Sequence, residues 1–461
     1  MRAGRRAGGR ADSYGRWPGL LLSLLSLTAG PPARLSASPA ARLPAQTPRD
    51  TGTVVLRAGR LFDSERGVFL TNQQILVQGR TIRAVGSTVT APAGARVIDL
   101  SGATMLPGLI DAHTHLLYLE HPKGDLTSEG MKAVVLEGTA LRALRGAARG
   151  RTFLAAGITT VRDLGNSGRF GDVALMRAIE EGSVDGPRMI ASGPGLSPIG
   201  GQFPGLQPAW QSIAAEEYRV VRNAEDAADA VRENVTLGAR VIKIYSNNTP
   251  NPGSFSDAEL AAIVESARRH GVKVAAHATS DAAVYRAARA GVNSIEHAYQ
   301  VTDSTLALMA KNGVMMVPTD MDTLSLERYL RQSGQYDTTR FRQFLGMLSP
   351  QQDRVRRAIR AGVTIAAGSD NYLDMGVPQG SAAIRNLFAY RAAGMTPAQV
   401  LQAATISDAR LLGMEGQLGV IKAGALAFTW TDRRSDGLTA GRTGSRSVGQ
   451  SVGRSVGPSY L

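Results

Sequence analysis

Six residues that can bind metal ions stand at or near the ends of short apolar stretches along this chain. Five stretches carry them, at residues 106–115, 241–244, 274–277, 294–297 and 366–370. The candidate ligands are His113, His115, Lys243, His277, His297 and Asp370. Four of the chain's six histidines are among them. If the stretches converge in space, residues of these types form a two-metal hydrolytic centre.

His113 and His115 form the most specific part of this pattern. Residues two apart on a strand share a face, so both imidazoles can bind one cation. Neutral imidazole is a common zinc ligand, at about 2.0–2.1 Å. A single histidine is more often an ordinary core residue. A His-x-His pair that closes an apolar strand after Pro107-Gly108 favours metal binding instead.

Lys243 lies within the apolar run Val241 to Ile244. A lysine buried in a strand is costly unless it is paired or neutralised. One interpretation is a lysine that reaches a carboxylate at the strand's end. The other is a lysine carboxylated by carbon dioxide, whose new carboxylate bridges two metals. Burial lowers the amine's pKa and so favours the nucleophilic amine that this reaction needs. Lys243 alone favours the first interpretation, but the set of histidines around it favours the second.

Asp370 ends the last of the five stretches. A carboxylate beside two cations can bind one of them, accept a proton from the attacking water and pass it to a leaving group. The alternative is a capping or turn aspartate, because Asp favours turns in general.

The sequence rhythm after Leu106 predicts an α/β fold, a (β/α)8 TIM barrel over residues 106–415. The strand candidates are mostly apolar on both faces, as in a parallel sheet covered by helices. Ser256 and Glu259 predict a capping box, and Thr396-Pro397 predicts a second helix start. Functional groups of such a barrel lie at the C-terminal strand ends. The strand candidates end near His115, Asp163, Ser192, Tyr245, His277, His297, Thr319 and Asp370.

The regions outside the barrel have distinct compositions. Residues 51–105 hold short strand-like runs, including 67–70 and 74–77, and predict a small β-sandwich-like domain. Residues 416–430 are a residual segment of that domain. Residues 431–461 are a low-complexity tract that we expect to be disordered.

The first fifty residues predict an export signal followed by a linker. Arginines precede a short apolar run at 20–27, and small residues follow it. We therefore expect a periplasmic or secreted protein; the alternative is a disordered basic leader. The apolar run is far shorter than the ~20 residues of a membrane-spanning helix, so no stable membrane span is expected.

Charge and cysteine content exclude other classes of function. The net charge is +14, but residues 1–50 carry +6 of it and residues 431–461 carry +3. The basic charge is therefore concentrated in two tails, which argues against a nucleic-acid partner. The chain has no cysteine, which excludes disulfides, thiolate catalysis and thiolate metal sites.

These motifs together resemble the amidohydrolase superfamily over about residues 53–427. Stretches 159–165, 193–201 and 291–297 resemble its branch of imidazolonepropionase-related amidohydrolases and Xaa-Pro dipeptidases. The resemblance implies that His113, His115 and Asp370 bind one metal and that His277 and His297 bind the other. Carboxylated Lys243 and a hydroxide would lie between the metals.

The resemblance also implies a role for Tyr285, eight residues after His277, in assisting at the scissile carbonyl. The alternative is an ordinary helix residue. The family pattern stops at Ala427, where members continue with further strands of the small domain. We therefore expect those C-terminal strands to be missing, as a frameshift would leave them.

The expected function is an exported two-metal hydrolase of a small molecule or dipeptide, most simply of the Xaa-Pro type. Arg169 and Gln202 are candidates for substrate binding. Zinc is the default metal, with manganese, cobalt and nickel as alternatives. The alternatives in function are a cyclic-amide hydrolase, a deaminase, or an inactive or misfolded relative. Deaminases of this superfamily usually use one metal and lack the lysine. A homo-oligomer is left open.

Overall fold

The computed structural model describes residues 52–123, 126–203, 205–247 and 253–428. The predicted signal peptide and linker at 1–50 and the predicted disordered tail at 431–461 lie outside the described residues, as does the proposed frameshifted end. In the described part, no helix is long and apolar enough to cross a membrane.

A small four-stranded sheet precedes the barrel. Its strands are β1 (Thr53–Asp63), β2 (Val68–Gln78), β3 (Thr81–Gly86) and β4 (Arg96–Met105), in the order β3-β2-β1-β4. β1 runs antiparallel to β2 and parallel to β4. The runs predicted separately at 67–70 and 74–77 belong to the single strand β2. Asn72 between them has a φ of 54°, but pairing with β1 continues on both sides of it.

The chain returns to this sheet after the barrel. Ile82 donates its backbone N–H to Ala425 O at 2.9 Å, and Ala427 donates to Arg80 O at 2.9 Å. Val420 and Ala425 are buried with Ile75 and Ile82 in one apolar cluster. The segment after the barrel therefore completes part of the small domain's core.

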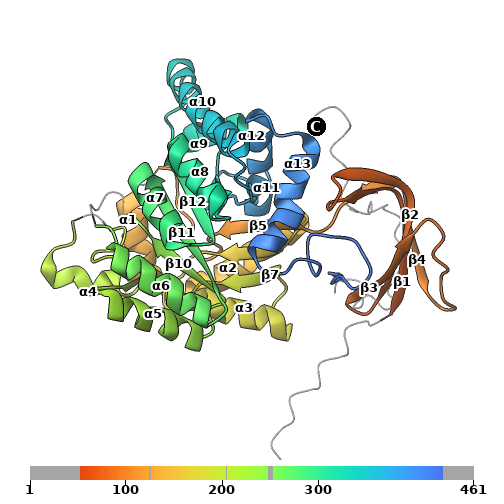
Figure 1. Ribbon diagram of the computed structural model, residues 1–461, viewed down its shortest axis with the longest axis horizontal. Helices are drawn as coiled ribbons and strands as arrows, with labels where there is room; N and C mark the ends of the chain where they lie inside the picture. The colour runs from red at the N-terminus through yellow and green to blue at the C-terminus, as the bar shows by residue number, and fades with distance from the viewer. Residues whose placement is uncertain (1–51, 124–125, 204, 248–252, 429–461) are drawn as a thin grey trace, which may run out of the picture. The chain divides into compact units, whose positions relative to one another are not determined.

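The barrel strands are parallel and, except for one short strand, neighbours in the sheets follow in chain order, which confirms the predicted fold class (Figure 1). They are β5 (Leu109–Thr114), β6 (Ile158–Asp163), β7 (Arg188–Ala191), β8 (Gly195–Ser197), β9 (Tyr218–Val220), β10 (Val241–Tyr245), β11 (Lys273–Ser280), β12 (Ser294–Gln300) and β13 (Met315–Val317). The short strand β8 pairs with β10, and β9 pairs with the other edge of β8; the sequence reasoning predicted neither.

Backbone hydrogen bonds close the barrel at its last strand. Met316 N–H donates to Thr364 O at 3.0 Å, and Ala112 N–H donates to Ala367 O at 2.8 Å. The segment that ends at Asp370 thus lies between β13 and β5, although only one bridge, from Met316 to Ile365, is regular. This closure brings the first and last predicted ligands together.

Helices alternate with the strands, and α5 to α8 flank β10 to β12 (Figure 1). The helices are α1 (Leu126–Lys132), the π-helical turn η1 (Ala133–Glu137), α2 (Gly138–Ala155), α3 (Gly171–Glu181), η2 (Pro208–Trp210), α4 (Gln211–Ala214), α5 (Ala224–Thr236), α6 (Asp257–Arg269), α7 (Asp281–Ala290), α8 (Asp303–Lys311), α9 (Thr323–Gln332), α10 (Thr338–Arg360), α11 (Gln379–Ala383), α12 (Asn386–Ala392), α13 (Pro397–Gln402), η3 (Ala403–Ser407) and α14 (Asp408–Leu411).

Local sequence explains where several helices begin. Ser256 and Glu259 form the predicted capping box at the start of α6. Thr396 and Gln399 form another at the start of α13, with Pro397 at the first helical position. The apolar faces of these helices pack on strand residues such as Val161 and Ile242 in one large core. That core fixes the strand ends that carry the candidate ligands.

Candidate metal centre

His113 and His115 lie at the end of β5 with their rings held from behind. His113 Nδ1 is 2.8 Å from Glu296 Oε2, and His115 Nδ1 is 2.9 Å from Gly165 O. A carbonyl oxygen only accepts, so His115 carries its proton on Nδ1 and leaves Nε2 free as a ligand. Both Nε2 atoms face Asp370 Oδ1, at 3.5 Å from His113 and 3.1 Å from His115.

Asp370 joins these two histidines through the barrel closure. Its backbone N–H donates to His113 O at 2.8 Å. One ligand atom from each of His113, His115 and Asp370 lies within 4.8 Å of the others. Burial alone would raise the pKa of Asp370, but the facing histidines lower it below its ordinary value. The carboxylate is therefore ionised at neutral pH.

Lys243 lies in the middle of β10 with its side chain 1% exposed. Its Nζ is 3.4 Å from His113 Nε2 and 5.3 Å from the centre of the Tyr245 ring. Among the described residues it forms no salt bridge, so the alternative of a lysine paired with a carboxylate is not what the structure shows. Burial lowers the pKa of Lys243 to about 8, which makes a neutral amine accessible near neutral pH.

His277 on β11 and His297 on β12 form the other side of the centre, with ring centroids 4.6 Å apart. His277 Nε2 is buried and has no hydrogen-bond partner within the described chain. Burial, helped by Lys243, lowers the pKa of His277 to about 3. His297 Nδ1 is 2.8 Å from Thr319 Oγ1, and burial lowers the pKa of His297 well below its ordinary value. Both rings are therefore neutral, the form that binds metals.

This donor set fits divalent metal ions. Burial lowers the pKa values of His113, His277 and His297, so these rings are neutral, and an unpartnered buried nitrogen is costly unless a ligand satisfies it. Against the effect of burial, the Asp370 carboxylate raises the pKa of His115, so a metal that binds there displaces a proton. The orphaned Nε2 of His277 therefore points to a bound ion. The structure brings the six predicted ligands together: His113 Nε2 lies 3.4 Å from Lys243 Nζ, and the rings of His115 and His297 have centres 5.2 and 5.3 Å from that of His113.

A buried charge network behind His113 was not found by the sequence reasoning. Glu296 is fully buried and receives hydrogen bonds from Arg162 Nη2 at 2.9 Å and Ser294 Oγ at 2.5 Å. Arg162 also donates to Ala112 O at 2.5 Å. The sequence offered one signal for this network, because Glu296 is a charged residue inside an apolar strand and such a residue requires a partner.

A second buried arginine supports His297. Arg354 on α10 donates to the carbonyl oxygens of His297 and, at 3.4 Å, of Pro318. It also pairs with Asp320 at 2.5 Å, with both side chains buried. Arg354 therefore ties the ends of β12 and β13 to a helix far along the chain. Nothing in the local sequence of α10 signals this contact.

Three predicted residues lie apart from the ligands. Tyr285 on α7 is 44% exposed, and its ring centre is 5.9 Å from the Arg289 guanidinium. Arg169 is exposed and lies 3.9 Å from Glu216. Gln202 follows β8, and its backbone hydrogen-bonds the Tyr218 hydroxyl. No contact links the three to the six ligands in the described residues, so their roles remain predictions.

Two other tyrosines and a cavity adjoin the centre. The rings of Tyr299 and Tyr372 lie 5.4 Å from His297 and 6.0 Å from His115, measured between ring centres. Asp370 lines a cavity of about 290 Å³ together with both tyrosines. The sequence reasoning identified neither tyrosine as part of the site. Tyr299 follows His297 by two residues on β12, so strand periodicity was an available signal, whereas Tyr372 lies in the segment after Asp370.

The chain matches the amidohydrolase family over residues 104–428 and belongs to that family. It is 28% identical to an ochratoxinase from Aspergillus niger, over 79% of this chain and 77% of that protein. It is 29% identical to an imidazolonepropionase from Symbiobacterium thermophilum, over 74% of this chain and 77% of that protein.

A solved structure supports the resemblance to the branch of imidazolonepropionase-related amidohydrolases and Xaa-Pro dipeptidases. A prolidase complexed with N-methylphosphonate-L-proline superposes with a TM-score of 0.69 and 30% identity, covering 81% of this chain and 91% of that one. Family relatives are hydrolases that act on carbon–nitrogen bonds, and this chain is an enzyme of that class.

Proposed function

We propose that this amidohydrolase uses two divalent metal ions, with zinc as the first candidate, to cleave an amide bond in a small substrate. The observation that carries this proposal is the position of Lys243. Its amine is buried, unpaired by any described carboxylate, and 3.4 Å from His113 Nε2. Carboxylation of that amine by carbon dioxide would supply the bridging ligand that a two-metal centre requires.

The remaining ligands divide into two groups. His113, His115 and Asp370 would hold one ion, and His277 and His297 would hold the other, with carboxylated Lys243 between them. Bound divalent ions would polarise the amide carbonyl and lower the pKa of water enough to give a nucleophile at neutral pH. The lowered pKa values of His113, His277 and His297 and the unpartnered His277 Nε2 support this assignment.

Asp370 is the candidate for proton transfer. Its pKa is held below the ordinary value, so it is ionised at neutral pH, which is the form that accepts the proton released by the attacking water. It can then return that proton to the departing nitrogen. Tyr285 is proposed to assist at the substrate carbonyl. Its side chain is 44% exposed, so it would act by contacting the substrate directly.

A dipeptide with C-terminal proline is the first substrate to test, because a prolidase is among the similar solved structures. The second candidate is a cyclic-amide hydrolase, since an imidazolonepropionase is among the relatives. A deaminase is less well supported, because Lys243 favours a centre with two metals. Metal analysis separates the two-metal and one-metal alternatives.

The test combines metal counting with one substitution. The purified protein should contain two ions per chain and should hydrolyse members of a dipeptide library. Asp370→Asn should abolish turnover while metal remains bound, whereas Asp303→Asn, at a side chain 80% exposed, should leave both unchanged. Full turnover in Asp370→Asn, or in thoroughly chelated protein, would exclude this mechanism.

Export to the periplasm or the outside of the cell is proposed from the sequence of residues 1–50 alone. Sequencing the N-terminus of the mature protein tests it. A mature chain that still begins at Met1 would contradict it.

A further inference from the structure

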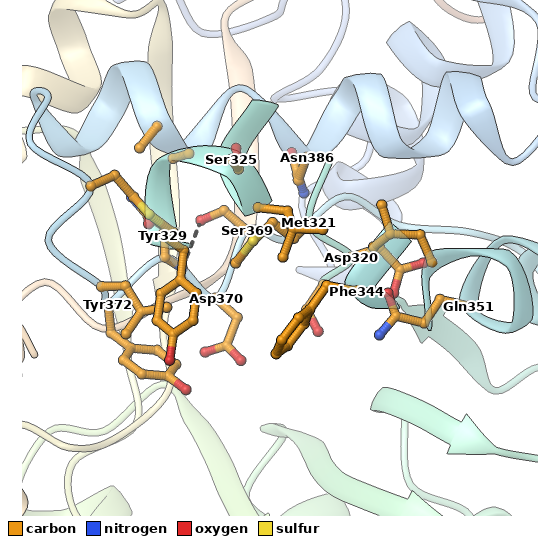
Figure 2. Close-up of a pocket in the computed structure, with 18 of the residues that line it drawn as sticks. Asp320, Met321, Ser325, Tyr329, Phe344, Gln351, Ser369, Asp370, Tyr372 and Asn386 are labelled. Carbon is orange, nitrogen blue, oxygen red and sulfur yellow. Dashed lines mark hydrogen bonds between the residues drawn. The ribbon is translucent and has the colours of Figure 1, made fainter. Parts of the chain in front are cut away.

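The cavity beside Asp370 is built mainly from apolar side chains. Its volume is about 290 Å³, close to the lower end of the ~300–1,000 Å³ typical of small-molecule sites. Its walls come from α9, α10 and the segment after Asp370 (Figure 2). The apolar part of the lining includes Leu326, Tyr329, Phe344, Met347, Leu348 and Met375.

The cavity borders the candidate centre at Asp370. Figure 2 shows the Asp370 carboxylate pointing into the space that Phe344 and Tyr372 also border. Asp370 Oδ1 is at the same time 3.1 Å from His115 Nε2. A substrate whose amide bond lies at the centre would therefore place one of its flanking groups in this cavity.

The cavity offers no unpaired charge to a charged group of a substrate. Asp320 and Asp370 are the charged residues in the lining, and no Lys, Arg or His is found there among the described residues. Asp320 already pairs with buried Arg354 at 2.5 Å, and Asp370 faces the histidines. A carboxylate or ammonium group entering the cavity would lose its hydration without gaining an ion pair.

The helices that form the cavity also pack against each other without the substrate. Leu326 and Leu330 from α9 and Leu348 from α10 are buried in one cluster, against which Tyr329 and Phe344 pack. A preformed apolar wall of this kind binds apolar groups with little reorganisation.

We propose that this cavity receives a large neutral apolar group, aromatic or branched aliphatic, that flanks the scissile amide bond. The inference rests on the proposed amide hydrolysis and specifies its substrate class. Any free carboxylate or amine of the substrate lies outside the cavity.

The first test compares two dipeptide series, glycyl-X and X-glycine, with the full-length metal-loaded protein. X is phenylalanine, leucine, alanine, aspartate or lysine. In at least one series, kcat/KM for phenylalanine or leucine should exceed that for alanine by ~10-fold or more. It should exceed the values for aspartate and lysine by roughly 100-fold or more. A preference for a charged X in both series, or no preference, overturns the inference.

Two matched variants locate the preference in the cavity. Met347 lines the cavity but is 58% exposed, so Met347→Lys introduces a charge without burying it. This variant should lower kcat/KM for the apolar substrates by roughly tenfold. Leu144 is 73% exposed on α2 and lies outside the lining, so Leu144→Lys should change nothing. Equal effects of the two variants would contradict the assignment.

A binding measurement separates this inference from the hydrolytic function. Saturation-transfer NMR on metal-free protein compares N-acetyl-L-phenylalaninamide with N-acetyl-L-lysinamide. Stronger transfer to the phenylalanine compound, weakened in Met347→Lys but not in Leu144→Lys, supports the cavity's role. Equal transfer to both compounds overturns it. If no dipeptide is hydrolysed but the binding preference is present, the proposed hydrolysis fails while the apolar selectivity of the cavity stands.

Discussion

Replacing Glu296 by glutamine is expected to weaken metal binding although Glu296 is not itself a proposed ligand. One carboxylate oxygen is 2.8 Å from His113 Nδ1, and the other accepts from Arg162 at 2.9 Å and Ser294 at 2.5 Å. Glutamine keeps the shape but presents an NH2 group to one of these donors. If NH2 faces His113, the proton moves to Nε2 and blocks the nitrogen that faces Asp370 and Lys243.

Glu296→Gln should lower both the metal affinity and the stability of the protein. Loss of a hydrogen bond that orients a metal-binding histidine typically lowers metal affinity ~10–100-fold, which corresponds to about 1.4–2.7 kcal/mol. Removing one partner of a buried ion pair typically costs about 3–5 kcal/mol of stability. Arg162 keeps its bonds to Ser294 Oγ at 3.0 Å and to Ala112 O at 2.5 Å, so we expect the lower end of that range.

Chelator competition measures the affinity, and urea unfolding of the metal-free protein measures the stability. Glu233→Gln is the matched control, because Glu233 pairs with Arg219 at 2.8 Å with its side chain 41% exposed. Exposed pairs contribute about 0–1 kcal/mol, so this variant should behave as the wild type. Wild-type metal affinity and urea midpoint in Glu296→Gln would refute the view that Glu296 orients His113.

Lys243→Ala should reduce the metal content from two ions to one or fewer per chain, measured by elemental analysis after reconstitution. In the wild type, bicarbonate-dependent metal uptake should rise with a midpoint near pH 8, because burial lowers the pKa of Lys243 to about 8; a midpoint above pH 10 would contradict this. Arg354→Met should cost about 3–5 kcal/mol in urea unfolding, because it leaves buried Asp320 unpaired. Burial and nearby Asp163 raise the pKa of Asp172 to about 7. An aspartate in the unfolded chain has a pKa of ~4. Between that pH and pH 7, Asp172 therefore holds a proton in the folded chain that it has lost in the unfolded chain. Stability should fall as pH rises across that interval, and Asp172→Asn should flatten the slope in urea titrations at pH 5 and pH 7.

Local sequence predicted the parts of this molecule that depend on local physics. The capping residues Ser256 and Thr396 mark the starts of α6 and α13 because their side chains bond to N–H groups three residues ahead. The strands that are apolar on both faces indicated the barrel, because both faces of a parallel sheet are covered by helices or by the barrel core. Lys243 stood out because a charge within such a strand requires an explanation.

Features that depend on distant contacts were not predictable in this way. The charge of Glu296 could be read from the sequence, but its partner Arg162 comes from a strand more than a hundred residues earlier. The cavity beside Asp370 is formed by α9 and α10, whose packing on that side of the barrel is not encoded in their helical periodicity. The short strands β8 and β9 contain three residues each, too few for a reliable periodic signal.

Backbone conformation at the strand ends connects stability with the candidate chemistry. His297, Ala298, Thr319 and Asp370 have φ values of 76°, 55°, 58° and 49°, in the left-handed region that favours glycine. Such residues cost about 1–3 kcal/mol each and persist only where their surroundings hold them. Arg354 donates to the carbonyl oxygens of His297 and Pro318, next to three of these residues. Since glycine at His297 or Asp370 would remove the strain but also the imidazole or the carboxylate, we infer that buried Arg354 helps to hold the candidate ligand His297 in this conformation. Arg354→Met should therefore weaken metal binding at His297 as well as lower stability, whereas a variant that only loosened the packing of α10 would lower stability alone.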